Sequence, residues 1–217
     1  MTNRFFITLI VVFAVIGGAF ALTKHSSSTK SGSSGSSSNV QPTNHTEGST
    51  KSGVTLIEYG DYQCPACGQY YPIVKQVVDT YKDQIMFQFR NFPLVQIHQN
   101  AFAGARAAEA ADKQGKFWEM HDVLYENQQT WGAASTPNTY FESYAKQLGL
   151  DVAKFKADYA SQAINDLINA DMQEGKNIGA NSTPTFVLDG QKIDQNPRSL
   201  DEFNKLIAAE IAKKAGH

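Results

Sequence analysis

The chain has 217 residues, a formal net charge of −2 and 41% hydrophobic residues. This length and composition permit one folded domain of moderate size together with additional segments. The absence of a basic excess argues against a nucleic-acid partner.

An apolar stretch lies near the amino terminus. Residues 5–22 carry no charged side chain, and Arg4 and Lys24 flank them. As a helix this stretch would span about 27 Å, close to the minimum for a bilayer core. We favour a retained transmembrane signal anchor over residues 1–22; the alternative is a cleaved signal peptide with a small-residue site at residues 19–21.

Both interpretations predict export of the rest of the chain. The weak bias of the flanking basic residues places the amino terminus inside the cell. We therefore expect a single-pass cell-membrane protein with an extracytoplasmic domain, or a secreted or periplasmic protein if the stretch is cleaved.

Residues 23–53 are dominated by Ser, Gly, Thr and Asn and contain almost no large apolar side chains. Such a composition cannot build a core, so it predicts a flexible linker with an end-to-end distance of about 30 Å. The pattern becomes globular at residue 54, and we predict one folded domain over residues 54–217.

The only two cysteines, Cys64 and Cys67, follow a strand-like run at 54–59 and precede a helix-like run at 68–82. Pro65 suits the first helical position, which makes Cys64 the N-cap residue. Both sulfurs then lie on one side of the first turn, where the helix dipole stabilises a thiolate. We predict that Cys64 is the exposed attacking sulfur and Cys67 the deeper, resolving sulfur.

A C-x-x-C pair has other interpretations. A structural zinc ion usually has four ligands, and there is no second cysteine pair. His98 and His121 lie among helical patterns, and we interpret them as ordinary helix residues. An inert disulfide closing so short a loop would restrict the unfolded chain little. We therefore favour a redox-active dithiol and predict no metal or organic cofactor.

Glu58 is out of place within the apolar strand at 54–59. It could point to a solvated face. Alternatively, it could be a buried carboxylate with a raised pKa that exchanges protons with Cys67. The residues alone leave both interpretations open.

The remaining pattern is α/β. A second strand is predicted at 85–92, and because one helix joins the two strands they should pair in parallel with a right-handed crossover. Residues 98–180 are mostly helical by pattern. Strands at 185–188 and 191–193 flank a tight turn, and a final helix at 200–213 completes a mixed sheet with helices on both faces.

This order resembles the thioredoxin superfamily, with Cys-Pro-Ala-Cys at 64–67 after the first strand and Thr183-Pro184 before the third. More narrowly, it is similar to the DsbA-like thiol–disulfide oxidoreductases. The resemblance implies a thioredoxin-like βαβ–ββα fold with an inserted helical subdomain at about 98–180. Residues 115–128 look like part of that insertion.

The resemblance also implies roles for individual residues. Pro184 should follow a cis peptide bond and pack against the cysteines, and Thr183 should offer backbone groups to an extended substrate. Pro65 and Ala66 would complete the substrate-binding surface. Glu58 matches the position of a buried acidic residue in DsbA-like proteins, which favours the proton-exchange role.

One departure concerns redox strength. The strongly oxidising member of the family has Pro-His between its cysteines, whereas this chain has Pro65-Ala66. Alanine cannot stabilise the thiolate electrostatically. We therefore expect a moderate oxidant, with a potential less extreme than the ~ −120 mV of DsbA and a Cys64 pKa above ~4.

The expected function is a membrane-tethered, extracytoplasmic oxidoreductase that promotes disulfide formation in exported proteins. Its substrates would be protein thiols, and a membrane redox partner would reoxidise Cys64 and Cys67. We see no added dimerisation segment and expect a monomer. The alternatives are a reductase or isomerase of the same fold, or a non-catalytic peptide-binding module.

Overall fold

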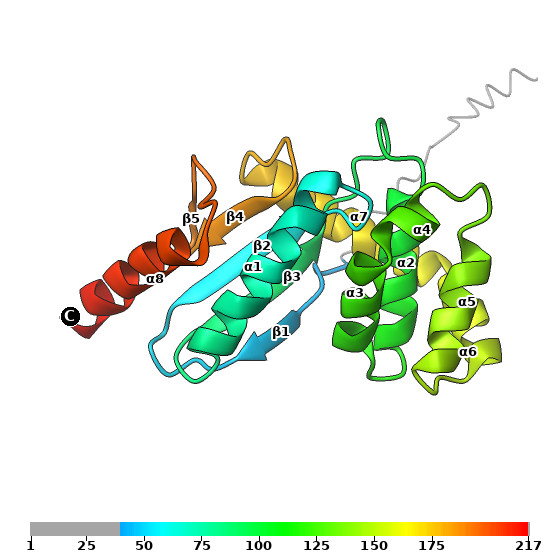
Figure 1. Ribbon diagram of the computed structural model, residues 1–217, viewed down its shortest axis with the longest axis horizontal. Helices are drawn as coiled ribbons and strands as arrows, with labels where there is room; N and C mark the ends of the chain where they lie inside the picture. Colours follow the sequence, from blue (N-terminus) through cyan, green and yellow to red (C-terminus); the bar gives the residue numbers. More distant parts are fainter. Residues whose placement is uncertain (1–39, 217) are drawn as a thin grey trace, which may run out of the picture. The chain divides into compact units, whose positions relative to one another are not determined.

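The computed structural model describes residues 40–216. This part of the chain contains one five-stranded sheet with the order β1-β3-β2-β4-β5 (Figure 1). Its strands are β1 (His45–Gly48), β2 (Thr55–Gly60), β3 (Met86–Asn91), β4 (Thr185–Leu188) and β5 (Gln191–Lys192).

The centre of the sheet is the predicted βαβ unit. Strands β2 and β3 pair in parallel, and α1 (Pro65–Tyr81) connects them. The other three pairings are antiparallel. The mixed sheet predicted from the sequence is therefore confirmed.

The two faces of the sheet follow from the alternation of side chains along β2. Leu56 is fully buried in the larger core, which also contains residues of α1 and of α8 (Leu200–Ala215). Tyr59 belongs to a smaller core on the opposite face, with Met172 of α7 packed against it. Glu58 is two residues after Leu56 in β2, so its side chain points to the same face of the sheet and lies beneath α1. Figure 1 shows α1 running across the sheet.

The helical insertion lies between β3 and β4, as predicted. It consists of α2 (Ala101–Asp112), α3 (Phe117–Glu126), α4 (Gln128–Gly132), α5 (Asn138–Gln147), α6 (Val152–Tyr159) and α7 (Gln162–Asn177). Its centre is Trp131, which is fully buried. A Cβ atom added at Gly104 would lie 2.9 Å from the Trp131 ring, so close packing requires a glycine there.

The carboxyl-terminal elements agree with the sequence. Asp189 and Gly190 have positive φ values of 47° and 79° and form the turn between β4 and β5. Ser199 caps α8, and its hydroxyl accepts a hydrogen bond from the Glu202 N–H. The Asp-Gly pair predicted the turn, and the serine before the helical pattern predicted the N-cap.

The predicted linker at residues 23–53 is wrong at its carboxyl-terminal end, because β1 lies within it. This strand pairs antiparallel with β3 at the edge of the sheet. Its sequence, His-Thr-Glu-Gly, is short and polar, so neither periodicity nor β-propensity reveals it. Residues 1–39, with the predicted anchor and most of the linker, lie outside the described residues.

Buried polar contacts hold this segment in place. Thr43 donates from its N–H and hydroxyl to the Asp171 carboxylate at 2.7 and 2.8 Å. The His45 ring lies 2.8 Å from Glu109 and stacks on Phe117 with ring centroids 3.5 Å apart. The folded domain therefore begins before residue 54. None of the helices within 40–216 combines the length and apolar character of a membrane span.

Candidate active site

The turn after β2 places Cys64 at the start of α1. The Asp61 carboxylate accepts a hydrogen bond from the Gln63 N–H at 2.8 Å, and the Asp61 carbonyl accepts one from the Cys64 N–H at 3.1 Å. Cys64 has the extended backbone of an N-cap residue, and Pro65 is the first helical residue. The predicted position of the cysteines at the first turn is therefore observed.

The environment of Cys64 favours its thiolate. Hydrogen bonding from the Cys67 thiol is the main cause that lowers the Cys64 pKa, from 9.0 to about 5, although burial opposes the shift. The backbone N–H groups of Cys67 and Ala66 contribute in the same direction. These are the unpaired donors of a helix amino terminus, which point toward an anion.

The environment of Cys67 has the opposite effect. Cys67 is fully buried, and burial is the main cause that holds its thiol pKa well above 9.0. Cys64 is only 6% exposed, so the prediction of an exposed sulfur was too strong. The Thr183–Pro184 segment covers it. The two sulfurs still differ in the predicted order, because Cys64 is the more accessible and the more readily ionised.

The peptide bond between Thr183 and Pro184 is cis, as the family resemblance implied. The Thr183 carbonyl oxygen lies 3.5 Å from the Cys64 sulfur, which donates to it as a thiol. Asn196 donates to the Pro184 carbonyl at 2.7 Å and helps to hold the segment. Thr183 and Pro184 are thus brought to Cys64, and Pro65 lies exposed beside them.

Glu58 is only 3% exposed, which excludes the interpretation that its side chain points to a solvated face. Burial, followed by repulsion from Cys64, raises its pKa from 4.5 to about 8. The carboxyl group is therefore uncharged at neutral pH and can donate a proton. Its charge, when present, would also raise the pKa of the Cys67 thiol.

A small cavity adjoins Glu58. Its volume is about 20 Å³, and Tyr71, His121 and Tyr125 also line it. A space of this size can hold one water molecule. The Tyr125 hydroxyl is buried and has no hydrogen-bond partner within residues 40–216, so it is available to such a water.

The sequence did not reveal a pair formed by Asp61 and His98. His98 lies in the loop before α2, not in a helix, and its Nδ1 lies 2.7 Å from the Asp61 carboxylate. The same carboxylate accepts from the Leu94 N–H at 2.9 Å. The pair joins this loop to the turn that carries Cys64. His121 lies in α3 as predicted, and burial lowers its pKa to about 3.

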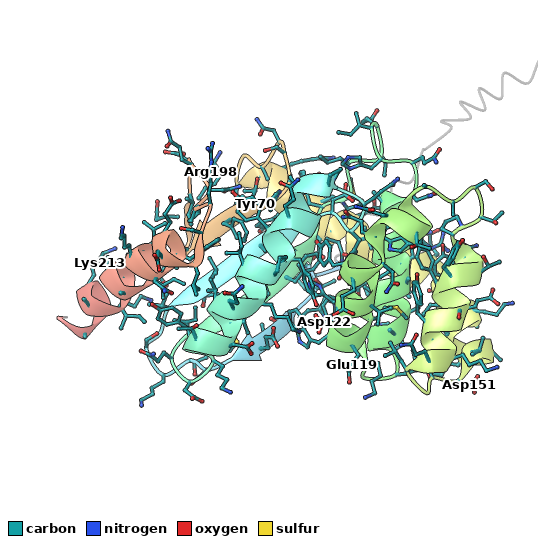
Figure 2. All side chains as sticks on the ribbon, in the orientation of Figure 1. Tyr70, Glu119, Asp122, Asp151, Arg198 and Lys213 are labelled. Carbon is teal, nitrogen blue, oxygen red and sulfur yellow. The ribbon has the colours of Figure 1, made fainter. Side chains whose placement is uncertain are left out.

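A surface hollow of about 510 Å³ adjoins the Thr183–Pro184 segment through Asn196. Figure 2 shows two of its residues, Tyr70 of α1 and Arg198, on the same part of the surface. The lining residues are Tyr70, Gln195, Asn196, Arg198 and Glu202. Polar side chains therefore surround a space that a polypeptide could enter.

Residues 40–209 match a protein-family model described as Thioredoxin. The chain is 32% identical over 168 residues to a Na(+)/H(+) antiporter NhaA 3 of Salinispora tropica, covering 77% of this chain and 25% of that protein. It is 35% identical over 153 residues to a Na(+)/H(+) antiporter NhaA 1 of Mycobacterium sp., covering 68% and 24%. The chain thus spans about a quarter of the length of these curated relatives.

Solved structures share the fold. A thioredoxin-like oxidoreductase from Silicibacter pomeroyi is 25% identical, with a TM-score of 0.64 over 79% of this chain and 92% of that one. BdbD from Bacillus subtilis is 22% identical, with a TM-score of 0.68 over 79% and 96%. Wolbachia pipientis alpha-DsbA1 is 19% identical, with a TM-score of 0.70 over 81% and 94%. The chain therefore belongs to the thioredoxin family, and its helical insertion gives it the DsbA-like form of that fold.

Proposed function

We propose that this chain is a thiol–disulfide oxidoreductase that acts through dithiol–disulfide exchange at Cys64 and Cys67. The observation that carries the proposal is the difference between the two sulfurs. Cys64 is stabilised as a thiolate by hydrogen bonds from the Cys67 thiol and from the backbone N–H groups of Ala66 and Cys67, while Cys67 is fully buried and holds its proton. Such a pair can form a mixed disulfide at one sulfur only.

The exchange begins with the Cys64–Cys67 disulfide. A substrate thiolate attacks the Cys64 sulfur, a substrate–Cys64 disulfide forms, and Cys67 leaves with the electron pair of the broken bond. The second substrate thiolate then attacks the substrate sulfur and releases Cys64 as a thiolate. The substrate has lost two electrons to the cysteine pair, which ends in the reduced form.

Glu58 supplies the proton that this sequence requires. Cys67 leaves into a buried site where its anion is strongly disfavoured. Neutral Glu58 donates a proton toward the departing Cys67, which becomes a thiol, and the Glu58 carboxylate regains its proton from solvent through the adjoining cavity. When the pair is reoxidised, the proton leaves Cys67 by the reverse route.

The substrate is an extended polypeptide segment that contains cysteine. Thr183, Pro184, Pro65 and Ala66 surround the Cys64 sulfur and contact the residues next to the substrate cysteine. The polar hollow beside Asn196 takes the continuing chain. Backbone contacts of this kind favour no particular sequence, which suits an enzyme that acts on many proteins.

In the cell, the predicted anchor at residues 1–22 and the linker after it tether the domain to the membrane. The domain oxidises exported proteins, and a membrane redox partner reoxidises it. The apolar stretch at 5–22 supports this placement. The oxidising direction follows from thiolate stabilisation, which favours the reduced pair. A Cys64 pKa of about 5 fits a moderate oxidant. The domain acts as a monomer.

The first test is the equilibrium reduction potential of Cys64–Cys67 in glutathione buffers, measured on the full-length chain. A value above about −180 mV, together with oxidation of a reduced model protein, is expected. A value below about −250 mV would instead show a reductase. If the pair does not cycle and the Cys64→Ser variant binds peptides as well as the wild type, the protein is a binding module.

A further inference from the structure

Gln128, the first residue of α4, contacts the active-site turn directly. Its side-chain amide nitrogen donates to the Cys64 carbonyl and to the Tyr62 carbonyl, both at 2.8 Å. A carboxamide nitrogen carries two hydrogen atoms, so each has one acceptor. Gln128 therefore holds the backbone on both sides of Gln63.

Gly68 makes this contact possible. A Cβ atom at Gly68 would lie 2.6 Å from the Gln128 side-chain oxygen and 3.1 Å from the carboxamide carbon and nitrogen. The carboxamide thus lies directly on the first turn of α1. The Gly68 N–H also donates to the Cys64 carbonyl at 3.1 Å, so that oxygen receives two hydrogen bonds.

Two further carboxamides join the same parts of the fold. Gln63 donates to the Gly132 carbonyl at 2.9 Å and accepts from the Asn100 N–H at 2.6 Å. Asn100 donates to the Ala134 carbonyl at 2.8 Å. The turn that carries Cys64 is therefore tied to α4 and the segment after it, which belong to the helical insertion.

We propose that Gln128 is a positioning residue through which the helical insertion holds Cys64 in the backbone conformation that presents its sulfur to the N–H groups of the first turn. The inference rests on the proposed function, since it concerns the reactivity of Cys64. The N–H groups of Ala66 and Cys67 stabilise the sulfur only while the Cys64 backbone stays extended, with φ −66° and ψ 121°. Gln128 does not touch the reacting sulfurs in this arrangement.

The test replaces Gln128 with Met, which keeps the length of the side chain and removes both donors. Gln129→Met is the matched control, because Gln129 is the exposed neighbour. We expect the Cys64 pKa of the full-length chain, followed by thiolate absorbance, to rise by ~0.5 unit or more in Gln128→Met, about a threefold change in the thiol–thiolate equilibrium. The reduction potential should fall by ~15 mV or more. Gln129→Met should match the wild type.

A second variant guards against loss of folding. Gly68→Ala adds a Cβ where the carboxamide lies, yet alanine is the better helix former. It should raise the Cys64 pKa in the same direction as Gln128→Met. If either folded variant is less stable but keeps the wild-type Cys64 pKa, Gln128 is only structural and the inference is overturned. Failure of the wild type to exchange disulfides would reject the proposed function alone, because the pKa comparison does not need turnover.

Discussion

Replacing Glu58 with Gln tests whether a neutral carboxyl group lies beneath the cysteines. The wild-type pKa is raised from 4.5 to about 8 by burial. Below pH 4.5 Glu58 is protonated in both the folded and unfolded states. Between pH 4.5 and 8 only the unfolded state releases the proton, so the stability of the wild type falls as pH rises. Above pH 8 both states are ionised and the loss is constant.

The size of this loss follows from the same pKa values. At ~1.36 kcal/mol per pKa unit, the full loss is about 5 kcal/mol, and about 3 kcal/mol of it is present at pH 7. Glu58→Gln cannot ionise and escapes the loss. The variant should therefore gain stability relative to the wild type as pH rises from 4. The gain in unfolding free energy should be about 3 kcal/mol at pH 7 and should approach about 5 kcal/mol above pH 8.

The assay is urea unfolding of the reduced full-length chain at several pH values. Because Glu58 stays neutral below pH 8, Cys64 titrates alike in both proteins and its contribution cancels. Glu119→Gln is a matched control, since Glu119 is a surface residue of α3 whose pKa is lowered by Lys116. Its effect should be small. A difference for Glu58→Gln that does not change with pH would refute a raised Glu58 pKa.

Three further predictions concern other parts of the structure. Cys64→Ser should fold normally and lose all exchange activity in a model-protein oxidation assay; residual turnover would place the reacting sulfur elsewhere. Thr183→Val removes a side chain that hydrogen-bonds the Cys64 thiolate and lowers its pKa, so the Cys64 pKa, followed by thiolate absorbance, should rise in the variant; an unchanged pKa would show that the Thr183 hydroxyl does not act on the sulfur. Asp171→Ala removes the acceptor for Thr43, so it should lower the unfolding free energy by roughly 3 kcal/mol and speed proteolysis near residue 43. Unchanged proteolysis would mean that other contacts hold β1.

Local signals made much of the fold predictable. Pro65 after Cys64 indicated the start of α1, Ser199 indicated the start of α8, and Asp189-Gly190 indicated the turn between β4 and β5. Each signal depends on residues within one turn of the feature that it predicts. The family resemblance then rested on the order of the motifs along the chain. The cysteines follow the first predicted strand, and Thr183–Pro184 precedes the third.

Features that depend on distant partners were not predictable. β1 is stabilised by Glu109, 64 positions after His45, and by Asp171, 128 positions after Thr43. No periodicity in a polar segment reports such contacts. The Asp61–His98 pair and the hydrogen bond from Gln128 to the Cys64 carbonyl are of the same kind, because each joins groups that are 37 and 64 positions apart in the sequence.

The proposed exchange depends on two sulfurs whose pKa values are shifted in opposite directions. A thiol with a low pKa leaves a disulfide more readily, which favours release of Cys64 from the substrate. Cys67 has the opposite property, since its raised pKa makes it a poor leaving group when substrate attacks. In the proposed exchange, the neutral carboxyl of Glu58 compensates by supplying a proton as Cys67 departs. Loss of that proton in Glu58→Gln should therefore slow reduction of the disulfide at pH 7 by ~100-fold or more in a stopped-flow assay, while leaving the release of substrate from Cys64 unchanged.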